Sequence, residues 1–524
     1  MTTVAAARTA DRPGGAQARP AAGVTIGIVG AGTMGCGIAQ VAAAAGHAVL
    51  LFDANPNAVE QAVHSVGSIF RRAVERGKVA AAVADDAIAR VKGVPRIEDV
   101  GAADLIIEAV VDDLEIKRRL FAMIEPVAHE RTVLATNTAS LSVAAVAASC
   151  ARPERVAGLH FFNPVPLTRL VEVVRAPRTA AATMARIVEI VSRLGHTPIV
   201  VEDTPGFVVN VAQSGVVGEA LRILEEGVAP PHVVDAVARN ALGFRLGPFE
   251  MLDLQGLDTI GATQQALFNQ FFGEPRLRPS PLASTRIAAG LLGRKSGQGF
   301  YRYENGQAVL PEPGPKPSDT RRPIWVSGTR PQLAAKVATA LSGAIDLAAG
   351  PNTPNYAVQL VTPLGLDATQ AATDEKLDPR RVVAVDTLFP LDRHVVLMPT
   401  PSTDPEALDA VHCGFLRAGR SVTIIEDSPG FIAQRLVAMT VAVAASLAER
   451  RTAAPDDIDR AVTMALGQQT GPLALGDRIG PRVIVEILQN LFRVTADPRW
   501  RIPPLLRRCA LLGQPLSPTA QTAS

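Results

Sequence analysis

The sequence predicts an α/β fold combined with all-α domains: a doubly wound sheet and a helical domain, followed by a degenerate α/β unit and a second helical copy. Three observations support this order. Apolar, β-prone runs alternate with helical patterns through residue 205, and residues 206–304 then carry helical periodicity alone. A motif at 202–210 also returns at 426–434, which indicates an internal duplication.

The composition is typical of a soluble globular protein. A chain of 524 residues is too long for one hydrophobic core, so we expect several domains. Hydrophobic residues make up 48% and charged residues 19%, with a net charge of +2, which argues against a nucleic-acid partner. No uninterrupted apolar run has the length of a membrane span, so no membrane partner is expected. The four cysteines lack metal-ligand spacing, which predicts reduced thiols in a cytoplasmic protein and no metal site.

The first element is a strand over 24–29, followed by a glycine-rich turn and a helix over 34–45. In the turn, the first glycine permits a tight bend, the second lets a pyrophosphate approach the backbone, and the third lets helix and strand pack closely. The helix N-terminus then faces the phosphates. The predicted loop residues are Gly30, Ala31, Gly32, Thr33, Met34 and Gly35.

The second strand, "AVLLFD", ends at Asp53, 18 residues after Gly35. A carboxylate there can accept hydrogen bonds from the adenosine ribose, which favours NAD over NADP as the cofactor. Strand, glycine turn, helix and terminal acid in this register predict a Rossmann-type, dinucleotide-binding domain.

Further strands are predicted at 103–111, 132–138, 156–162 and 170–175, with a helical pattern in "DLEIKRRLFAMIEPVAH" between the first two. Because strands alternate with helices, we expect a doubly wound, parallel sheet.

The second half repeats three motifs of the first at one offset. "EDTPGFVVN" (202–210) returns as "EDSPGFIAQ" (426–434), Asp235 returns as Asp459, and "GPFEMLD" (247–253) returns as "GPLALGD" (471–477), each 224 positions later. We infer duplication of at least the helical domain. Strand-like runs in 323–427 indicate a second α/β unit, whose first strand is followed by "GTRPQLAAK" rather than a glycine loop, so we expect it not to bind a dinucleotide.

Domain boundaries follow changes in composition. The first residues lack the apolar core of a signal peptide, and five prolines in 311–323 mark a linker. The predicted units are a disordered tail (1–22), the Rossmann domain (23–205), a helical domain (206–304), a proline-rich linker (305–322), the degenerate α/β unit (323–427), the second helical copy (428–512) and a tail (513–524).

"VAGLHFFNPVP" (156–166) places His160, one of only eight histidines, in an apolar run. A lone histidine in such a run is often a packed core residue. An imidazole is also a suitable general base near neutral pH. Glu172 follows twelve residues later, in the next predicted strand, where a carboxylate could orient the ring, although it could be a surface residue of an edge strand.

The motifs "GAGTMG", "GLHFFNPVP", "DTPGFVVN", "LGPFEMLD" and "GRKSGQGFY" resemble those of the 3-hydroxyacyl-CoA dehydrogenases, over about residues 24–512. They resemble in particular the longer bacterial form, which includes 3-hydroxyadipyl-CoA dehydrogenases. The resemblance implies NAD-dependent oxidation of an L-3-hydroxyacyl-CoA to the 3-ketoacyl-CoA, in fatty-acid β-oxidation or phenylacetate breakdown. It also implies a homodimer held by the helical domain.

The resemblance also assigns roles to particular residues. It implies that His160, Glu172 and Asn210 are catalytic, although Asn210 could simply cap a helix. Asp112 stands where the family has glutamate, and Lys117 and Lys295 could be solvated surface lysines. The cofactor-binding residues that it implies are the glycine loop, Asp53, Asp112, Lys117, Asn137 and Lys295.

Two departures from the family stand out. The chain reads "NTASL" where the family reads "NTSSL", so the family's serine falls on Ala139 and its neighbour is Ser140. Loss of a donor at a reacting oxygen typically costs a few kcal/mol of transition-state stabilisation, so we expect a slower enzyme, a different substrate or a rearranged site. Val211 stands where the family commonly has arginine, whose structural role would then be missing.

The second half lacks the catalytic residues. Gln434 stands 224 positions after Asn210, and "VVLMPTP" (395–401), matched to "GLHFFNP", has no histidine. We therefore expect a structural role for this half, which either duplicates the helical dimer surface within one chain or completes the substrate cleft. The oligomeric state is open for this reason.

Two other functions fit the sequence. One is a non-catalytic NAD- or acyl-CoA-binding protein, with Ala139 as the sign of lost chemistry, and the other is a dehydrogenase of a free 3-hydroxy acid. Affinity for CoA would separate the latter from an acyl-CoA enzyme. Four cations after Asp53 could bind CoA phosphates or be merely solvated: Arg71, Arg72, Arg76 and Lys78.

Overall fold

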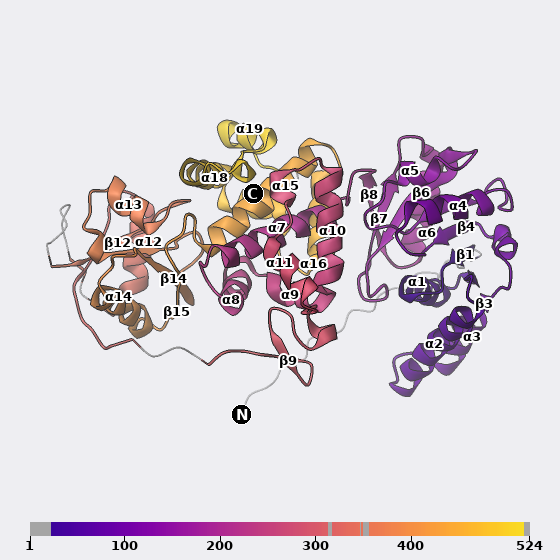
Figure 1. Cartoon of the computed structure of the whole chain (residues 1–524), viewed down its shortest axis with the longest axis horizontal. Coiled ribbons are helices and arrows are strands. Elements are labelled where there is room, and N and C mark those ends of the chain that lie inside the picture. The colour runs from indigo at the N-terminus through magenta and orange to yellow at the C-terminus, as the bar shows by residue number, and fades with distance from the viewer. Residues whose placement is uncertain (1–22, 313–316, 346, 349–355, 518–524) are drawn as a thin grey trace, which may run out of the picture.

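The computed structural model describes residues 23–312, 317–345, 347–348 and 356–517. The predicted disordered tail over 1–22 lies outside these residues. Figure 1 shows an elongated molecule, with an α/β unit at each end and a layer of helices between them.

The first α/β unit, residues 23–205, contains an eight-stranded sheet in the order β3-β2-β1-β4-β5-β6-β7-β8, and confirms the Rossmann-type fold. Its strand order reverses between β1 and β4, the point where such sheets bind ligands. The elements are β1 (Thr25–Val29), α1 (Thr33–Ala44), β2 (Ala48–Phe52), α2 (Pro56–Glu75), α3 (Ala81–Ala89), β3 (Val91–Gly93), β4 (Leu105–Glu108), α4 (Leu114–Ile124), β5 (Val133–Thr136), α5 (Val143–Ala147), β6 (Val156–Phe161), β7 (Leu170–Arg175), α6 (Ala181–Arg193) and β8 (Thr197–Glu202).

The sheet is parallel except for β6 and β7, which pair antiparallel. The connection from Phe161 to Leu170 explains the exception, since it is too short for the crossover that parallel neighbours need. Neither this reversal nor the strands β3 and β8 were predicted from the sequence.

The two helical copies confirm the duplication. Asp235 accepts hydrogen bonds from the backbone N–H groups of Phe249 and Glu250, and Asp459 accepts the same pair from Leu473 and Ala474. The first copy contains α7 (Val209–Glu225), α8 (Pro231–Leu242), α9 (Pro248–Gln255), α10 (Leu257–Gln270) and α11 (Pro281–Ala288), and the second contains α15 (Ile432–Glu449), α16 (Pro455–Leu466), α17 (Pro472–Ile479), α18 (Pro481–Thr495) and α19 (Pro504–Leu512).

Two predicted boundaries are wrong. Part of the predicted linker forms a hairpin between β9 (Arg302–Glu304) and β10 (Gln307–Val309). The predicted C-terminal tail begins inside the fold, because Leu516 and Ser517 are buried and donate their N–H groups to Asp477.

The second α/β unit has a five-stranded sheet in the order β11-β12-β13-β14-β15, as its strand-like runs predicted. It contains β11 (Ile324–Val326), α12 (Pro331–Leu341), β12 (Val358–Val361), α13 (Ala368–Asp374), β13 (Val382–Val385), β14 (His394–Pro399), α14 (Pro405–Arg417) and β15 (Ser421–Ile424).

The strand pairing corrects one match made from sequence. β13 pairs antiparallel with β14, as β6 does with β7. The counterpart of "VAGLHFFNP" is therefore "VVAVDTLFP" (382–390), and not "VVLMPTP", which belongs largely to β14. His160 lies opposite Glu172 in the first sheet. Asp386 lies opposite Val396 at the equivalent position of the second sheet and donates its N–H to the carbonyl of Val396.

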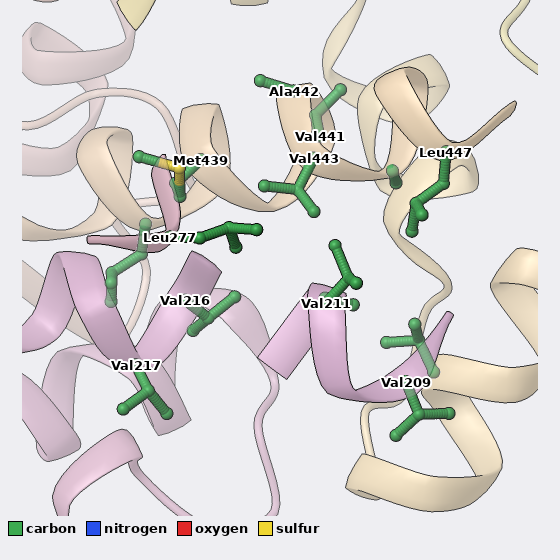
Figure 2. Packing of buried hydrophobic residues seen from close by; sticks show 14 of the residues in the cluster. Val209, Val211, Val216, Val217, Leu277, Met439, Val441, Ala442, Val443 and Leu447 are labelled. Atoms are coloured by element: carbon green, nitrogen blue, oxygen red, sulfur yellow. The ribbon is translucent and has the colours of Figure 1, made fainter. Parts of the chain in front are cut away.

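The helical copies pair with each other through α7 and α15, whose apolar side chains form one buried cluster (Figure 2). Each α/β unit also reaches the helical copy of the other half. Glu202 donates its backbone N–H to the carbonyl of Thr452, and Glu426, 224 positions later, donates its N–H to Val228, which lies 224 positions before Thr452. The two halves therefore form a pseudo-twofold pair within one chain.

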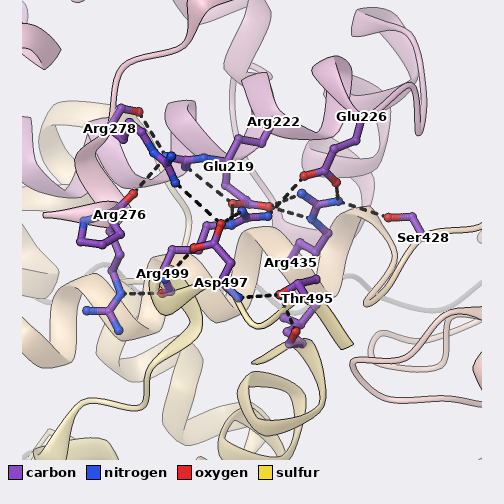
Figure 3. Close-up of polar contacts among 12 residues, drawn as sticks. Glu219, Arg222, Glu226, Arg276, Arg278, Ser428, Arg435, Thr495, Asp497 and Arg499 are labelled. Carbon is purple, nitrogen blue, oxygen red and sulfur yellow. Dashed lines mark hydrogen bonds and ion pairs between the residues drawn. The ribbon is translucent and has the colours of Figure 1, made fainter. Parts of the chain in front are cut away.

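Arg435 stands 224 positions after Val211, so the second copy has an arginine where the first has valine. Its guanidinium is buried and donates to Glu219 at 2.7 Å and to Glu226 at 2.5 Å (Figure 3). The residue 224 positions after Glu219 is Val443, and Figure 2 shows Val211 and Val443 facing each other in the apolar cluster. The pseudo-symmetric pair thus keeps one ion pair and replaces the other with two valines.

The helix α15 is long and apolar enough to cross a membrane by length and composition alone, a property that the sequence analysis did not note. In this molecule 83% of it is buried, against α7 and the other helices of both copies. We therefore interpret it as a core helix.

Candidate active site

The glycine turn after β1 has the geometry that a phosphate needs. Gly30 has a φ of +112°, and a Cβ on Gly35 would lie 1.8 Å from the carbonyl oxygen of Gly30. A Cβ on Gly32 would meet nothing within 4 Å, so the space beside this residue is open. Gly32 is also the N-cap of α1. Since glycine has no side chain to cap the helix, the first N–H groups of α1 stay available to an anion.

Asp53 follows β2 at the same edge of the sheet and braces the turn. Its Oδ2 accepts a hydrogen bond from the N–H of Ala31 at 2.8 Å, and its Oδ1 accepts from Asn55 at 2.9 Å. Thr33 and Met34 lie in the first turn of α1, the former exposed and the latter half-buried. Open glycine, uncapped helix and half-buried carboxylate together fit a dinucleotide.

His160 and Glu172 lie directly opposite each other on β6 and β7, which brings the predicted pair together. The imidazole Nδ1 and the carboxylate Oε2 are 2.7 Å apart. Glu172 is fully buried, and its Oε1 accepts hydrogen bonds from the N–H groups of Val208 and Val209 at 2.9 and 3.0 Å. Because the imidazole Nδ1 contacts Glu172, Nε2 is the ring nitrogen that can face a ligand.

Two aromatic rings enclose the histidine. The ring centroids of His160 and Phe162 are 4.3 Å apart, and that of Phe207 is 5.8 Å away. Phe207 adopts a φ of +53°, unusual for a residue with a side chain, and the neighbouring helix α7 supplies the N–H groups that hold Glu172. The helical domain therefore positions the pair as well as covering it.

The loop after β5 is bonded on both sides of Ala139. Its N–H donates to Asp112 at 3.1 Å, and its carbonyl accepts a hydrogen bond from the side-chain amide of Asn210 at 2.9 Å. The hydroxyls of Thr138 and Ser140 donate to the same oxygen of Asp112, at 3.1 and 3.4 Å. The structure thus places Asn210 against the backbone at the position where the family's serine is missing.

Asn137 ties this loop to the strand that carries the histidine, because its Oδ1 accepts a hydrogen bond from the N–H of Phe161 at 3.0 Å. Gly30, Asn137 and His160 all lie at the carboxyl ends of parallel strands. These ends meet at one edge of the sheet, which is where doubly wound folds bind their ligands.

Lys117 is fully buried and lies beneath the loop. Its ammonium group donates to both carboxylate oxygens of Glu108, at 2.7 and 2.8 Å, and lies 3.2 Å from Asp112. Burial raises the pKa of Glu108, against the lowering effect of Lys117. The lysine therefore holds two carboxylates in place instead of projecting into solvent.

Glu108, which was not predicted from the sequence, also accepts hydrogen bonds from Thr136 and from the N–H of Val110. A single acid within the apolar strand "LIIEAVV" was the available signal, since a buried carboxylate needs a partner.

The remaining predicted cations lie elsewhere. Lys295 belongs to the helical domain, where it pairs with Asp258 at 2.6 Å and is about half exposed. The side chains of Arg71, Arg72, Arg76 and Lys78 are exposed at the end of α2. Among the described residues, no group of three or more His, Cys, Asp or Glu side chains could hold a metal ion.

Comparisons with known proteins agree with the fold. Residues 25–204 match the family model described as the NAD-binding domain of 3-hydroxyacyl-CoA dehydrogenase, and residues 206–303 and 430–522 both match its C-terminal domain. The chain is 36% identical to 3-hydroxyadipyl-CoA dehydrogenase of Escherichia coli, over 93% of this chain and 98% of the relative. It is 37% identical to a probable 3-hydroxybutyryl-CoA dehydrogenase of Bacillus subtilis, over 53% of this chain and 96% of that protein. The crystal structure of 3-hydroxybutyryl-CoA dehydrogenase from Escherichia coli matches with a TM-score of 0.81 and 34% identity, over 93% of this chain and 98% of that one.

Proposed function

This chain belongs to the 3-hydroxyacyl-CoA dehydrogenase family, and on that premise we propose that His160, oriented by Glu172, is the general base in the oxidation of an L-3-hydroxyacyl-CoA to the 3-ketoacyl-CoA. The family makes it an NAD-dependent oxidoreductase. The observation that carries the proposed mechanism is the 2.7 Å contact between imidazole and buried carboxylate at the ligand-binding edge of the sheet.

The proton transfer follows from the arrangement of the pair. Bound NAD supplies the hydride acceptor for C3 of the substrate. In the tautomer that carries its proton on Nδ1, facing Glu172, His160 can accept the proton of the C3 hydroxyl at Nε2. Glu172 stabilises the imidazolium that results, as in other His–carboxylate pairs.

Asn210 and Asp112 act on the loop beside this base. Because they hold the carbonyl and the N–H of Ala139, they fix the backbone where the family has a serine hydroxyl. We propose that they are positioning residues. Lys117 holds Asp112 in turn, so its effect on the cofactor is indirect.

The acyl group of the substrate is a further proposal. One relative is named for 3-hydroxyadipyl-CoA and another for 3-hydroxybutyryl-CoA. We propose that this chain acts on one of these two thioesters, in the cytoplasm.

The direct test is oxidation of NADH with acetoacetyl-CoA, followed by absorbance at the NADH band. We expect turnover that free CoA inhibits. Turnover of free acetoacetate instead would support a dehydrogenase of free 3-hydroxy acids. No turnover by a folded protein that binds NADH would overturn the mechanism and support the non-catalytic alternative, for which the only specific observation is Ala139.

The oligomeric state is a separate proposal. The family resemblance implies a homodimer held by the helical domain. We propose that the internal pairing of α7 with α15 takes the place of that dimer, which is the alternative that the duplication left open.

A further inference from the structure

Two adjoining cavities of about 480 and 560 Å³ lie between the second α/β unit and the helical layer. They meet at the end of α8 and at the loop after β13. Both are lined by Asn240, Ala241, Gly243, Phe389, Pro390 and Gln469. Cavities of this size accommodate small organic ligands.

Pseudo-symmetry places these cavities where the first half has its active site. Asp386, the counterpart of His160, lines the first cavity. Leu364 lines the second cavity. It is the third residue after β12, just as Ala139 is the third residue after β5. Gln434, the counterpart of Asn210, donates to Asp386 at 2.9 Å and accepts from Gly365 at 2.7 Å.

The second site cannot perform the chemistry of the first. Val396 replaces the orienting carboxylate, and the side chain of Asp386 is already bonded to Gln434 and to the N–H of Leu388. The cleft is nevertheless retained, with its loop and helix joined by side-chain hydrogen bonds. Loss of catalytic groups without collapse of the cleft indicates a binding role.

The larger cavity combines cations with apolar surface, whereas the smaller one also carries the carboxylates of Asp386 and Asp392. Lys336 and Arg478 line the larger cavity and Arg393 the smaller one. In 23–312, 317–345, 347–348 and 356–517, no carboxylate lies within ion-pair distance of these three; Lys336 is 3.5 Å from the carbonyl of Thr387, and Arg478 is 3.4 Å from the hydroxyl of Thr470. The apolar part of the larger cavity comes from Leu333, Leu364, Leu388, Ile479 and Val483.

We propose that this cleft is a second, non-catalytic binding site for an amphipathic anion, an acyl chain joined to a carboxylate or to a CoA thioester. The ammonium and guanidinium groups of Lys336 and Arg478 receive the anionic group, and the leucine, isoleucine and valine side chains receive the chain. The choice of an acyl ligand rests on the proposed function, because the cleft is the counterpart of the acyl-CoA site of the first half.

The test counts bound ligand by calorimetry, using butyryl-CoA, which has neither a hydroxyl nor a keto group at C3 to react. The full chain with NAD should bind two molecules per chain. Lys336→Ala with Arg478→Ala should bind one and keep its rate with acetoacetyl-CoA. Lys92→Ala with Arg507→Ala, which removes two exposed cations elsewhere, should still bind two.

A second variant tests the space instead of the charge. Ala241 lines both cavities, so Ala241→Trp should fill their junction and also reduce the count to one. If octanoate displaces one of the two butyryl-CoA molecules, the ligand of the second site is a carboxylate. If free CoA displaces that molecule and octanoate does not, the ligand is the thioester.

One molecule of butyryl-CoA per chain in the unmodified protein with no octanoate bound beside it, or two in both cleft variants, overturns the proposal. The dehydrogenase assay tests the proposed function independently of this count. If the unmodified chain is inactive but binds two molecules, and Lys336→Ala with Arg478→Ala binds one, the second site stands although the proposed function fails.

Discussion

At the scale of single residues, the proposed chemistry depends on a carboxylate that is bonded at both oxygens. Glu172 is fully buried, with one oxygen on His160 and the other on the backbone N–H groups of Val208 and Val209, at the start of α7. An unpaired buried carboxylate is costly, so its contacts determine where the imidazole lies. The sequence predicted this pair, but a spacing of twelve residues did not show that the helical domain would hold it.

Glu172→Gln should lower kcat by a hundred-fold or more, the usual range for loss of general-base catalysis. The amide can donate to Nδ1, which moves the imidazole proton to Nε2 and removes the base. Stopped-flow and steady-state assays would measure this, with NADH affinity unchanged. The exposed Glu130→Gln is the matched control, and an equal rate in both variants would contradict the mechanism.

Ala139→Ser should raise kcat with acetoacetyl-CoA by about tenfold or more, because a donor near a reacting oxygen typically contributes a few kcal/mol. The loop backbone is already held by Asp112 and Asn210, so the new hydroxyl enters a fixed frame. Steady-state kinetics of both proteins would measure the gain. No gain would show that this chain has reorganised its site around the alanine.

At the scale of elements, the same capping device occurs twice. The carboxylates of Asp235 and Asp459 accept the free N–H groups at the starts of α9 and α17. Glycines at 247 and 471 make this approach possible, since a Cβ at either would lie 2.2 to 2.3 Å from the aspartate side chain. The repeat of Asp235 could be read from sequence, but its role as a cap depends on a contact 14 residues away.

Burial raises the pKa of Asp235 to about 7, although its hydrogen bonds oppose the shift. Between about pH 4 and pH 7 the folded state therefore holds a proton that the unfolded state has released, so stability falls as pH rises through this window. Asp235→Asn removes this titration. Urea denaturation should show that the substitution destabilises the protein more at pH 5 than at pH 7.5, and an equal effect at both would refute the shift.

At the scale of the whole molecule, the duplicated halves have diverged around a pseudo-twofold axis. The first half keeps the glycine loop and the His–Glu pair, and the second keeps Arg435. This arginine contacts Glu219 and Glu226 of the first copy, and Arg499 joins the same network (Figure 3). Apolar packing of Val211 against Val443 therefore replaces the arginine ion pair on one side of the axis, while Arg435 keeps it on the other.

Arg435→Met should destabilise the protein by about 3–5 kcal/mol, because it leaves the buried Glu219 without its main partner. Arg435→Val with Glu219→Val repeats the valine pair of the other side and should cost less than Arg435→Met. Denaturant unfolding of the three proteins would test this order. A double variant less stable than the single one would contradict it.

Internal pairing predicts a particle of one chain, 54.9 kDa, in solution. The apolar side of α7 is covered by α15, so the first helical copy already has a partner within the chain. Mass photometry at nanomolar concentration distinguishes this from the homodimer that the family implies, since a particle of twice the mass would favour the dimer.

The sequence by itself determined the glycine turn, the candidate base and its carboxylate, the NAD-dependent family and the duplication, because each is a local pattern of a few residues or a repeat of one. Only the tertiary structure decided that Lys117 is buried under its two acids, that β7 runs antiparallel to β6, and that Asp386 is the counterpart of His160. These depend on which distant segments meet. Burial and strand register arise from packing across the whole chain, and a local pattern carries no record of that packing.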